Sequence, residues 1–211
     1  MTTSTFDRSC RACPRLAAFL DDVNARYPDY YCRPVPPFGA PGARFLIVGL
    51  APGMHGANRS GRPFTGDHAG ILLYQMLHKY GFSSRNHSES ADDGLDLIDC
   101  RITNAVKCLP PDNKPVGAEI NTCNAFLANE LGRLPEGSVV MALGGIAHRA
   151  IIKAMGLRQV EYKFGHAALH ALGDFQVLDS YHCSRYNTNT GRLTEAMFDA
   201  IFAQARELLD K

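Results

Sequence analysis

The sequence of 211 residues contains no tryptophan, and no apolar run in it approaches the length of a transmembrane helix. Residues 1–8 contain no apolar signal region, so we expect a cytoplasmic protein without a membrane partner. A P-loop and a cluster of carboxylates for Mg²⁺ are also lacking, which argues against nucleotide hydrolases of those types. Because internal repeats and low-complexity linkers are absent too, we predict one domain over residues 1–211 and a monomer.

Acidic residues are absent from three segments that we predict to be loops after strands, 49–66, 101–111 and 181–192. The whole chain has a formal net charge of +1, so its overall balance does not indicate a polyanionic partner. If the three segments meet in space, their basic residues form a positive face suited to phosphates, the alternative being chance clustering. The basic residues concerned are Arg59, Arg62, Arg101, Lys107, Arg185 and Arg192.

Hydrophobic runs alternate with amphipathic segments along the chain. Strands are predicted at 44–50, 98–106, 138–143 and 175–180, of which 44–50 and 138–143 are the most continuously apolar. The amphipathic or capped segments predict helices at 14–27, 71–80, 116–134, 144–155 and 193–209. This alternation predicts an α/β fold, a three-layer αβα sandwich around a central four-stranded, mostly parallel sheet. Residues 83–93 predict a mobile polar loop, and residues 158–168 an extended excursion.

The stretch 49–70 connects the first predicted strand to a helix, which is where open α/β sheets hold their ligands. Its six glycines let backbone N–H groups approach a ligand closely. Phe64 offers a flat stacking surface, and Asp67 is the only carboxylate in the stretch. We interpret Asp67 as a candidate functional residue, with the N-cap of the following helix as the alternative.

Residues 181–192 are dense in hydrogen-bonding groups and contain almost nothing that packs in a core. His182 follows a predicted strand and stands beside Ser184 and Asn187, so we interpret it as functional. The other seven histidines are interpreted as structural. Among them, His166 and His170 are slightly stronger candidates for a functional role, because they lie in a segment that resembles a functional turn.

The cysteines fall into a set of four and three others. Cys10 and Cys13 form a C-x2-C pair, Cys108 follows a predicted strand, and Cys123 lies on a predicted helix. In a reducing compartment, cysteines do not indicate a disulfide framework. Four thiolates so placed could close a tetrahedral zinc site or hold a [4Fe–4S] cluster, and spacing alone does not decide between them. Cys100 is predicted to be a small hydrophobic core residue.

Several separated motifs are familiar in combination: GLAPG at 49–53, GRPFTGD at 61–67, NAVKC at 104–108 and HCSRYNTNTGR at 182–192. Together with the cysteine spacing, they resemble the iron–sulfur uracil-DNA glycosylases over nearly the whole chain. The likeness is greatest to family 5, the B type. Family 4 carries Glu where this chain has Leu50, and other branches carry Asp or Asn at the position of Ala51. Cys183 departs from the proline or valine of many relatives.

The resemblance implies hydrolytic removal of uracil, and of other deaminated bases such as hypoxanthine and xanthine, from DNA to leave an abasic site. Phe64 would stack on the flipped base and Asn104 would read its edge. His182 would stabilise the charge on the departing base. Because position 51 has no acid, Asp67 would orient the attacking water.

The resemblance also implies contacts to DNA and a cofactor. Arg185 and Tyr186 would fill the gap left by the flipped base, and Asn187 would support His182 or contact the base or sugar. The remaining residues assigned to base or DNA binding are Ala51, Gly53 and Arg192. A structural [4Fe–4S] cluster would be held by Cys10, Cys13, Cys108 and Cys123.

Two other functions are weighed against this one. A DNA- or nucleotide-binding module with the same fold but no catalysis is the first, because the most familiar acid of the superfamily is missing. A zinc-stabilised nucleotide hydrolase of unrelated mechanism is the second. Formation of abasic sites in DNA that contains uracil separates the glycosylase from both.

Overall fold

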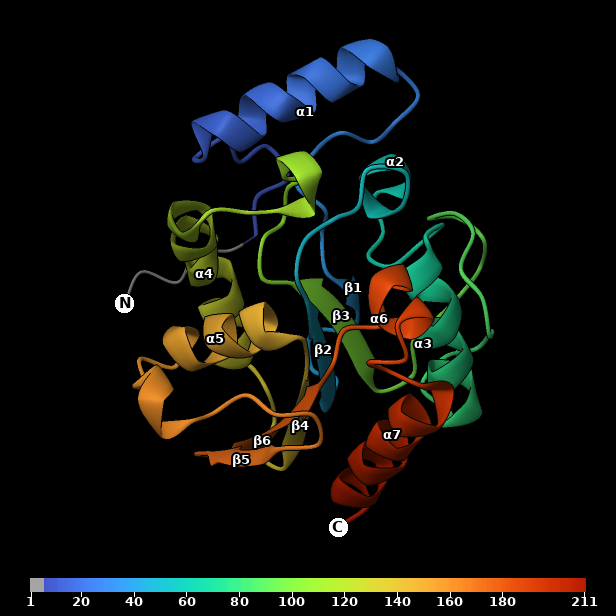
Figure 1. Ribbon diagram of the computed structural model, residues 1–211, viewed down its shortest axis with the longest axis vertical. Coiled ribbons are helices and arrows are strands. Elements are labelled where there is room, and N and C mark those ends of the chain that lie inside the picture. The colour runs from blue at the N-terminus through green and yellow to red at the C-terminus, as the bar shows by residue number, and fades with distance from the viewer. Residues whose placement is uncertain (1–5) are drawn as a thin grey trace.

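One mixed sheet organises the computed structural model, which describes residues 6–211 (Figure 1). Its six strands lie in the order β1-β3-β2-β4-β6-β5. They are β1 (Phe38–Gly39), β2 (Phe45–Gly49), β3 (Cys100–Asn104), β4 (Ser138–Leu143), β5 (Leu169–Leu172) and β6 (Phe175–Ser180). The inner four strands are parallel and coincide with the four predicted strands.

The two edge strands are antiparallel to their neighbours, so the predicted count of four strands is too low. β1 has two residues, and β5 has exposed positions at Leu169 and Ala171. Neither has the continuous apolar run that reveals a strand buried on both faces. β5 is part of a hairpin with β6 and follows the predicted excursion 158–168.

Helices cover both faces of the sheet, as predicted (Figure 1). α3 (His68–Lys79) and α7 (Glu195–Leu209) pack on one face, and α4 (Gly117–Leu131) and α5 (Gly145–Ala154) on the other. β2 illustrates the division, because Phe45 and Ile47 face the first pair of helices while Leu46 and Val48 face the second. All four side chains are fully buried, as alternation along a central strand requires.

The remaining helices surround the carboxyl ends of the strands. α1 (Pro14–Arg26) lies outside the two helical layers, and its Leu16 packs with Val106 beyond the end of β3. α2 (Ala57–Ser60) and α6 (Arg185–Asn189) are short helices within stretches predicted as loops. No helix in residues 6–211 is long and apolar enough to cross a bilayer.

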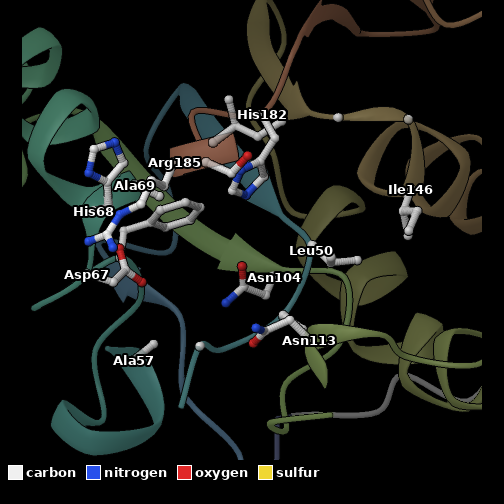
Figure 2. A pocket seen from close by; sticks show the side chains of 17 residues that line it. Leu50, Ala57, Asp67, His68, Ala69, Asn104, Asn113, Ile146, His182 and Arg185 are labelled. Carbon is white, nitrogen blue, oxygen red and sulfur yellow. The ribbon is translucent and has the colours of Figure 1, made fainter. Parts of the chain in front are cut away.

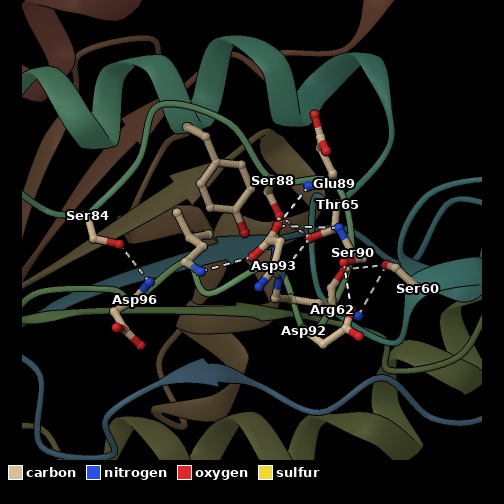
Figure 3. Close-up of polar contacts among 12 residues, drawn as sticks. Ser60, Arg62, Thr65, Ser84, Ser88, Glu89, Ser90, Asp92, Asp93 and Asp96 are labelled. Carbon is tan, nitrogen blue, oxygen red and sulfur yellow. Dashed lines mark hydrogen bonds and ion pairs between the residues drawn. The ribbon is translucent and has the colours of Figure 1, made fainter.

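The polar segment 83–93 is tied to the glycine-rich stretch by hydrogen bonds (Figure 3). Asp93 accepts from the side chain of Arg62 and from the backbone N–H groups of Glu89, Ser90 and Leu95. Asp93, an acidic residue of this segment, therefore forms an internal ion pair with Arg62. The predicted mobile loop is instead a segment with defined contacts to the stretch that carries Phe64.

Candidate active site and cysteine cavity

A cavity of about 470 Å³ lies where the four parallel strands end (Figure 2). Ala51 and Gly53 follow β2, Asn104 ends β3, Gly144 follows β4, and His182 follows β6; all five line the cavity. β2 and β3 are in register with Gly49 opposite Asn104, so their ends coincide. The predicted convergence of polar motifs at this edge of the sheet is confirmed.

Phe64 and His182 form the aromatic part of the cavity. Their ring centroids are 5.9 Å apart and their planes are inclined by 28°. Phe64 is buried and has a φ of +54°, a left-handed conformation that is uncommon and costly for a bulky residue. Position 49 must be glycine, because a Cβ there would lie 2.7 Å from the Phe64 ring and would also collide with the amide oxygen of Asn104.

Two buried polar atoms at the cavity have no hydrogen-bond partner within residues 6–211, Oδ1 of Asn104 and Nδ1 of His182. A buried polar group without a partner costs about 1–3 kcal/mol, so both atoms favour a ligand that supplies the missing partners. An apolar ring, an amide and an imidazole around one space suit a planar heterocycle with a polar edge.

Burial lowers the pKa of His182 to about 4, so the imidazole is neutral at physiological pH. The amide Nδ2 of Asn187 donates to the carbonyl oxygen of His182 over 2.8 Å. Asn187 is itself held where α6 begins, because Ser184 caps that helix by accepting from the Asn187 N–H. Asn187 thus fixes the backbone of His182, and its side chain does not line the cavity.

Asp67 lines the cavity and is also the N-cap of α3, so the geometry is consistent with both interpretations of this residue. Its Oδ1 accepts from the N–H of Gly70 over 2.9 Å. Its Oδ2 is directed toward Gly53 and Gly56; a Cβ on Gly56 would lie 2.7 Å from Cβ of Asp67. Burial raises the pKa of Asp67, although the N–H groups of Gly70 and Ala69 partly counter it.

Three residues assigned to DNA contacts lie outside or at the rim of the cavity. Arg185 lines it, whereas Tyr186 on the same helix is 72% exposed and points away from the core. The guanidinium of Arg192 lies 4.8 Å from the centroid of the Tyr181 ring and does not reach the cavity. A second groove of about 950 Å³ adjoins the cavity and shares Asp67 and Arg185 with it.

The predicted positive face is reduced by internal ion pairs. Arg62 pairs with Asp93, and both Arg101 and Lys107 pair with Glu130. Lys107 is fully buried, with its ammonium 2.8 Å from Glu130. These three cations are therefore not available to phosphates. The acidic partners come from other segments of the chain, so the absence of acids within a loop does not show that its basic residues are unpaired. The exposed residues that remain are Arg59, Arg185 and Arg192.

Two lining residues were missed by the sequence analysis, Asn113 and His68 (Figure 2). Asn113 lies in the turn PPDNKP after β3, where Asp112 and Asn113 both have left-handed φ values near +55°. Asn and Asp tolerate that conformation, so the turn could have been predicted, but not its approach to the cavity. His68 begins α3, and its Nε2 lies 3.1 Å from the hydroxyl of Thr188.

A separate cavity of about 450 Å³ is lined by Cys10, Cys13, Cys108 and Cys123. The structure brings the four predicted ligands together from the segment before α1, the end of β3 and the middle of α4. Burial and the neighbouring cysteines raise the pKa of Cys108 to about 12. All seven cysteines are free thiols, and Cys100 is a buried core residue, as predicted.

The spacing of the four thiols bears on the metal. Four sulfurs bound to one zinc ion at about 2.3 Å lie about 3.8 Å from one another. Within residues 6–211, the one group of three or more potential ligand atoms closer than 4.8 Å to one another is His148, His170 and Asp179. No three of the four thiols therefore lie within 4.8 Å of one another in residues 6–211. Their number, chemistry and shared cavity fit an iron–sulfur cluster.

His148, His170 and Asp179 form an internal polar cluster away from both cavities. The carboxylate of Asp179 accepts from His148 over 2.7 Å and from His170 over 3.2 Å. Nε2 of His148 lies 2.9 Å from the carbonyl oxygen of Tyr162, so both of its ring nitrogens are already engaged. The structural interpretation of His148 and His170 is thus supported by their contacts.

Comparison with known proteins relates the chain to the uracil-DNA glycosylases. The model of the family described as "Uracil DNA glycosylase superfamily" matches residues 36–206. A type-5 uracil-DNA glycosylase of Thermus thermophilus is 48% identical over 206 residues, which cover 95% of this chain and 94% of that protein. One of Pyrobaculum aerophilum is 43% identical over 88% and 83% of the two chains. One of Mycobacterium leprae is 42% identical over 94% and 91%.

Proposed function

The chain belongs to the type-5 branch of the uracil-DNA glycosylase superfamily, and from this premise we propose that it removes uracil from DNA by hydrolysis. The observation that carries the proposal is the meeting of Phe64, Asn104 and His182 at one cavity, where Asn104 and His182 each have one buried polar atom without a hydrogen-bond partner among the described residues. Water adds to C1′ of the deoxyribose as the bond to the base breaks. The products are free uracil and an abasic site.

Recognition begins with a uracil that has left the base stack, at a cost of a few kcal/mol. Its ring lies against Phe64, since stacking on an aromatic side chain contributes about 1–3 kcal/mol. The amide of Asn104 pairs with the polar edge of the base and thereby satisfies the unpaired Oδ1.

The chemical step separates charge between the sugar and the departing base. His182 is neutral in the free protein, so it donates a hydrogen bond to the base oxygen on which negative charge accumulates. One such preorganised donor contributes about 2.7–4 kcal/mol to transition-state stabilisation. Asp67 orients the water through the oxygen that does not cap α3.

The adjoining groove supplies the path of the polynucleotide. It is continuous with the base cavity through Asp67 and Arg185, and it opens toward the segment 86–89. Arg185 and the exposed Tyr186 stand on α6 at the rim, where they enter the space that the flipped base leaves. Hypoxanthine and xanthine are further substrates, because neither position 50 nor position 51 places a carboxylate against the base.

Cys10, Cys13, Cys108 and Cys123 hold a [4Fe–4S] cluster in this proposal, supported by their shared cavity and wide spacing. The cluster supplies structural cross-linking rather than chemistry at the base. The residues it joins belong to the start of α1, the end of β3 and α4.

The test is abasic-site formation in oligonucleotides that differ in one base. Purified protein is incubated with oligonucleotides that contain uracil, hypoxanthine, xanthine or thymine, and the strand is then cleaved at abasic sites with alkali. Cleavage at uracil, hypoxanthine and xanthine but not at thymine is expected. Binding of the uracil strand without cleavage contradicts glycosylase activity and supports the catalytically inactive DNA-binding module.

A further inference from the structure

Arg62 is a buried cation that the proposed chemistry does not use. Its side chain is 4% exposed, although it lies in a glycine-rich loop at the face proposed to meet DNA. Its guanidinium pairs with Asp93 over 2.5 Å, and Asp93 is itself only 12% exposed. A residue placed in this way does not contact a phosphate, so its position requires another explanation.

Arg62 is hydrogen-bonded to the residue that follows Phe64. Its Nε donates to Oγ1 of Thr65 over 3.0 Å, and a terminal nitrogen donates to Oγ of Ser88 over 2.6 Å. Ser88 in turn lies 2.6 Å from the hydroxyl of Thr65 (Figure 3). Thr65, which follows Phe64, is thus held by both Arg62 and Ser88, and its hydroxyl also lies 3.2 Å from the carbonyl oxygen of Pro63.

The other partner of this arrangement is the polar segment 83–93. Asp93 accepts N–H groups of Glu89 and Leu95 over 2.9 Å each, so its carboxylate is fixed by its own loop before it meets Arg62. The segment therefore presents a rigid acceptor to the stretch that carries Phe64. A charged pair of this kind retains its geometry well, because the guanidinium is planar and its donors are fixed.

Phe64 needs such support because its backbone is strained. A left-handed φ of +54° in a bulky residue costs about 1–3 kcal/mol and persists only where the surroundings impose it. The hydroxyl of Tyr74 donates to the carbonyl oxygen of Pro63 and adds one further contact. Relaxation of this backbone would turn the ring away from the base cavity.

We propose that Arg62 and Asp93 are a positioning pair, which holds Phe64 in its strained conformation so that its ring forms the stacking surface for the base. This inference rests on the proposed function for the identity of the base. The pair acts through Phe64 and does not contact the substrate. The polar segment 83–93 therefore helps to shape the base cavity, because it supplies Asp93.

The experiment is a double-mutant cycle with Asp93→Asn and Phe64→Leu, measured as single-turnover excision of uracil from a single-stranded oligonucleotide. Asp93→Asn is expected to lower the rate about tenfold, which lies within the range of one lost base–aromatic stack. In the Phe64→Leu background the same change is expected to lower the rate less than about twofold, because the ring is already absent. Equal factors in the two backgrounds overturn the inference.

A matched control separates positioning from general stability. Asp99→Asn breaks the ion pair of Asp99 with Arg44 at the opposite end of β2 and β3. It should lower Tm while leaving the excision rate within about twofold of the wild type. If Asp93→Asn does not fold, Ser88→Ala removes one contact to Arg62, and its smaller effect must also vanish in the Phe64→Leu background.

A crystal structure tests the positioning role of the pair independently of the proposed activity. In a crystal structure of Asp93→Asn, or of Ser88→Ala if needed, Phe64 is expected to leave the left-handed region and its ring to leave the cavity. An unchanged Phe64 overturns the positioning role whether or not the protein is active. A wild-type protein that does not release uracil overturns the proposed function alone.

Discussion

His148 donates from Nδ1 to Asp179 over 2.7 Å, and its Nε2 lies 2.9 Å from the carbonyl oxygen of Tyr162. Both neighbours are acceptors, and this arrangement favours a proton on each ring nitrogen. Burial opposes this charge, but the hydrogen bonds to Asp179 and Tyr162 outweigh burial and raise the pKa of His148 above its ordinary value. This buried hydrogen bond joins α5 to β6, and it becomes an ion pair when His148 is protonated.

The free energy of unfolding should consequently fall as pH rises through the pKa of folded His148. The unfolded imidazole titrates near about 6.5, so the stabilisation is complete below that pH and is lost above the raised value. Thermal melts from about pH 5 to about pH 9 measure this slope. His148→Gln should abolish it, whereas the exposed His87→Gln should retain it. Asp179→Asn should destabilise the protein by about 3–5 kcal/mol.

The activity should depend on pH differently, because burial lowers the pKa of His182 to about 4. We predict that single-turnover excision stays constant as pH falls through about 6.5, the ordinary histidine value. A protonated His182 would still donate a hydrogen bond, so the fall in rate on acidification is expected from Asp67, whose pKa burial raises and whose charge orients the water. A midpoint near the ordinary histidine value would show that His182 does not titrate as its burial requires.

The two interpretations of Asp67 can be separated by two substitutions. Asparagine is as good an N-cap as aspartate, so Asp67→Asn should keep the stability while removing the charge. Asp67→Ala should also lose the cap, at a cost of about 0.5–2 kcal/mol. If Asp67 orients water, both variants lower turnover at least about tenfold, or about 1.4 kcal/mol. If only Asp67→Ala is impaired, the residue is a helix cap.

Removal of one cysteine ligand should remove the cofactor and weaken the fold. If the proposed cluster is present, Cys108→Ser is expected to lose the iron, the sulfide and the brown colour of the purified protein, and to lower Tm, because the cluster would join α1 to β3 and α4. Cys32→Ser lies outside that cavity and should retain all of these properties. Analysis of iron, sulfide and zinc decides the matter, and a colourless wild-type protein that contains zinc contradicts the assignment.

The sequence determined the four parallel strands at the centre of this fold. β2 and β4 are buried along their whole length between helices and appear as apolar runs, whereas β3 and β6 are buried at every position except Arg101 and Gln176. The polar motifs at 51–53, 104 and 182 lie at or just beyond the ends of these strands. Because parallel strands end at the same edge of a sheet, the sequence predicted that Phe64, Asn104 and His182 lie close together. The four cysteines were likewise predicted as a set, and the structure places all four at one cavity.

Only the tertiary structure decided which charges are free. Arg62, Arg101 and Lys107 were predicted to face a phosphate, yet they are paired with Asp93 and Glu130, which lie 23 to 31 residues away in sequence. The left-handed conformation of Phe64 and the approach of Asn113 to the cavity also depend on contacts between distant segments. Local pattern reports whether a side chain is apolar or charged. Which residue a charged side chain pairs with depends on how segments distant in sequence pack against one another.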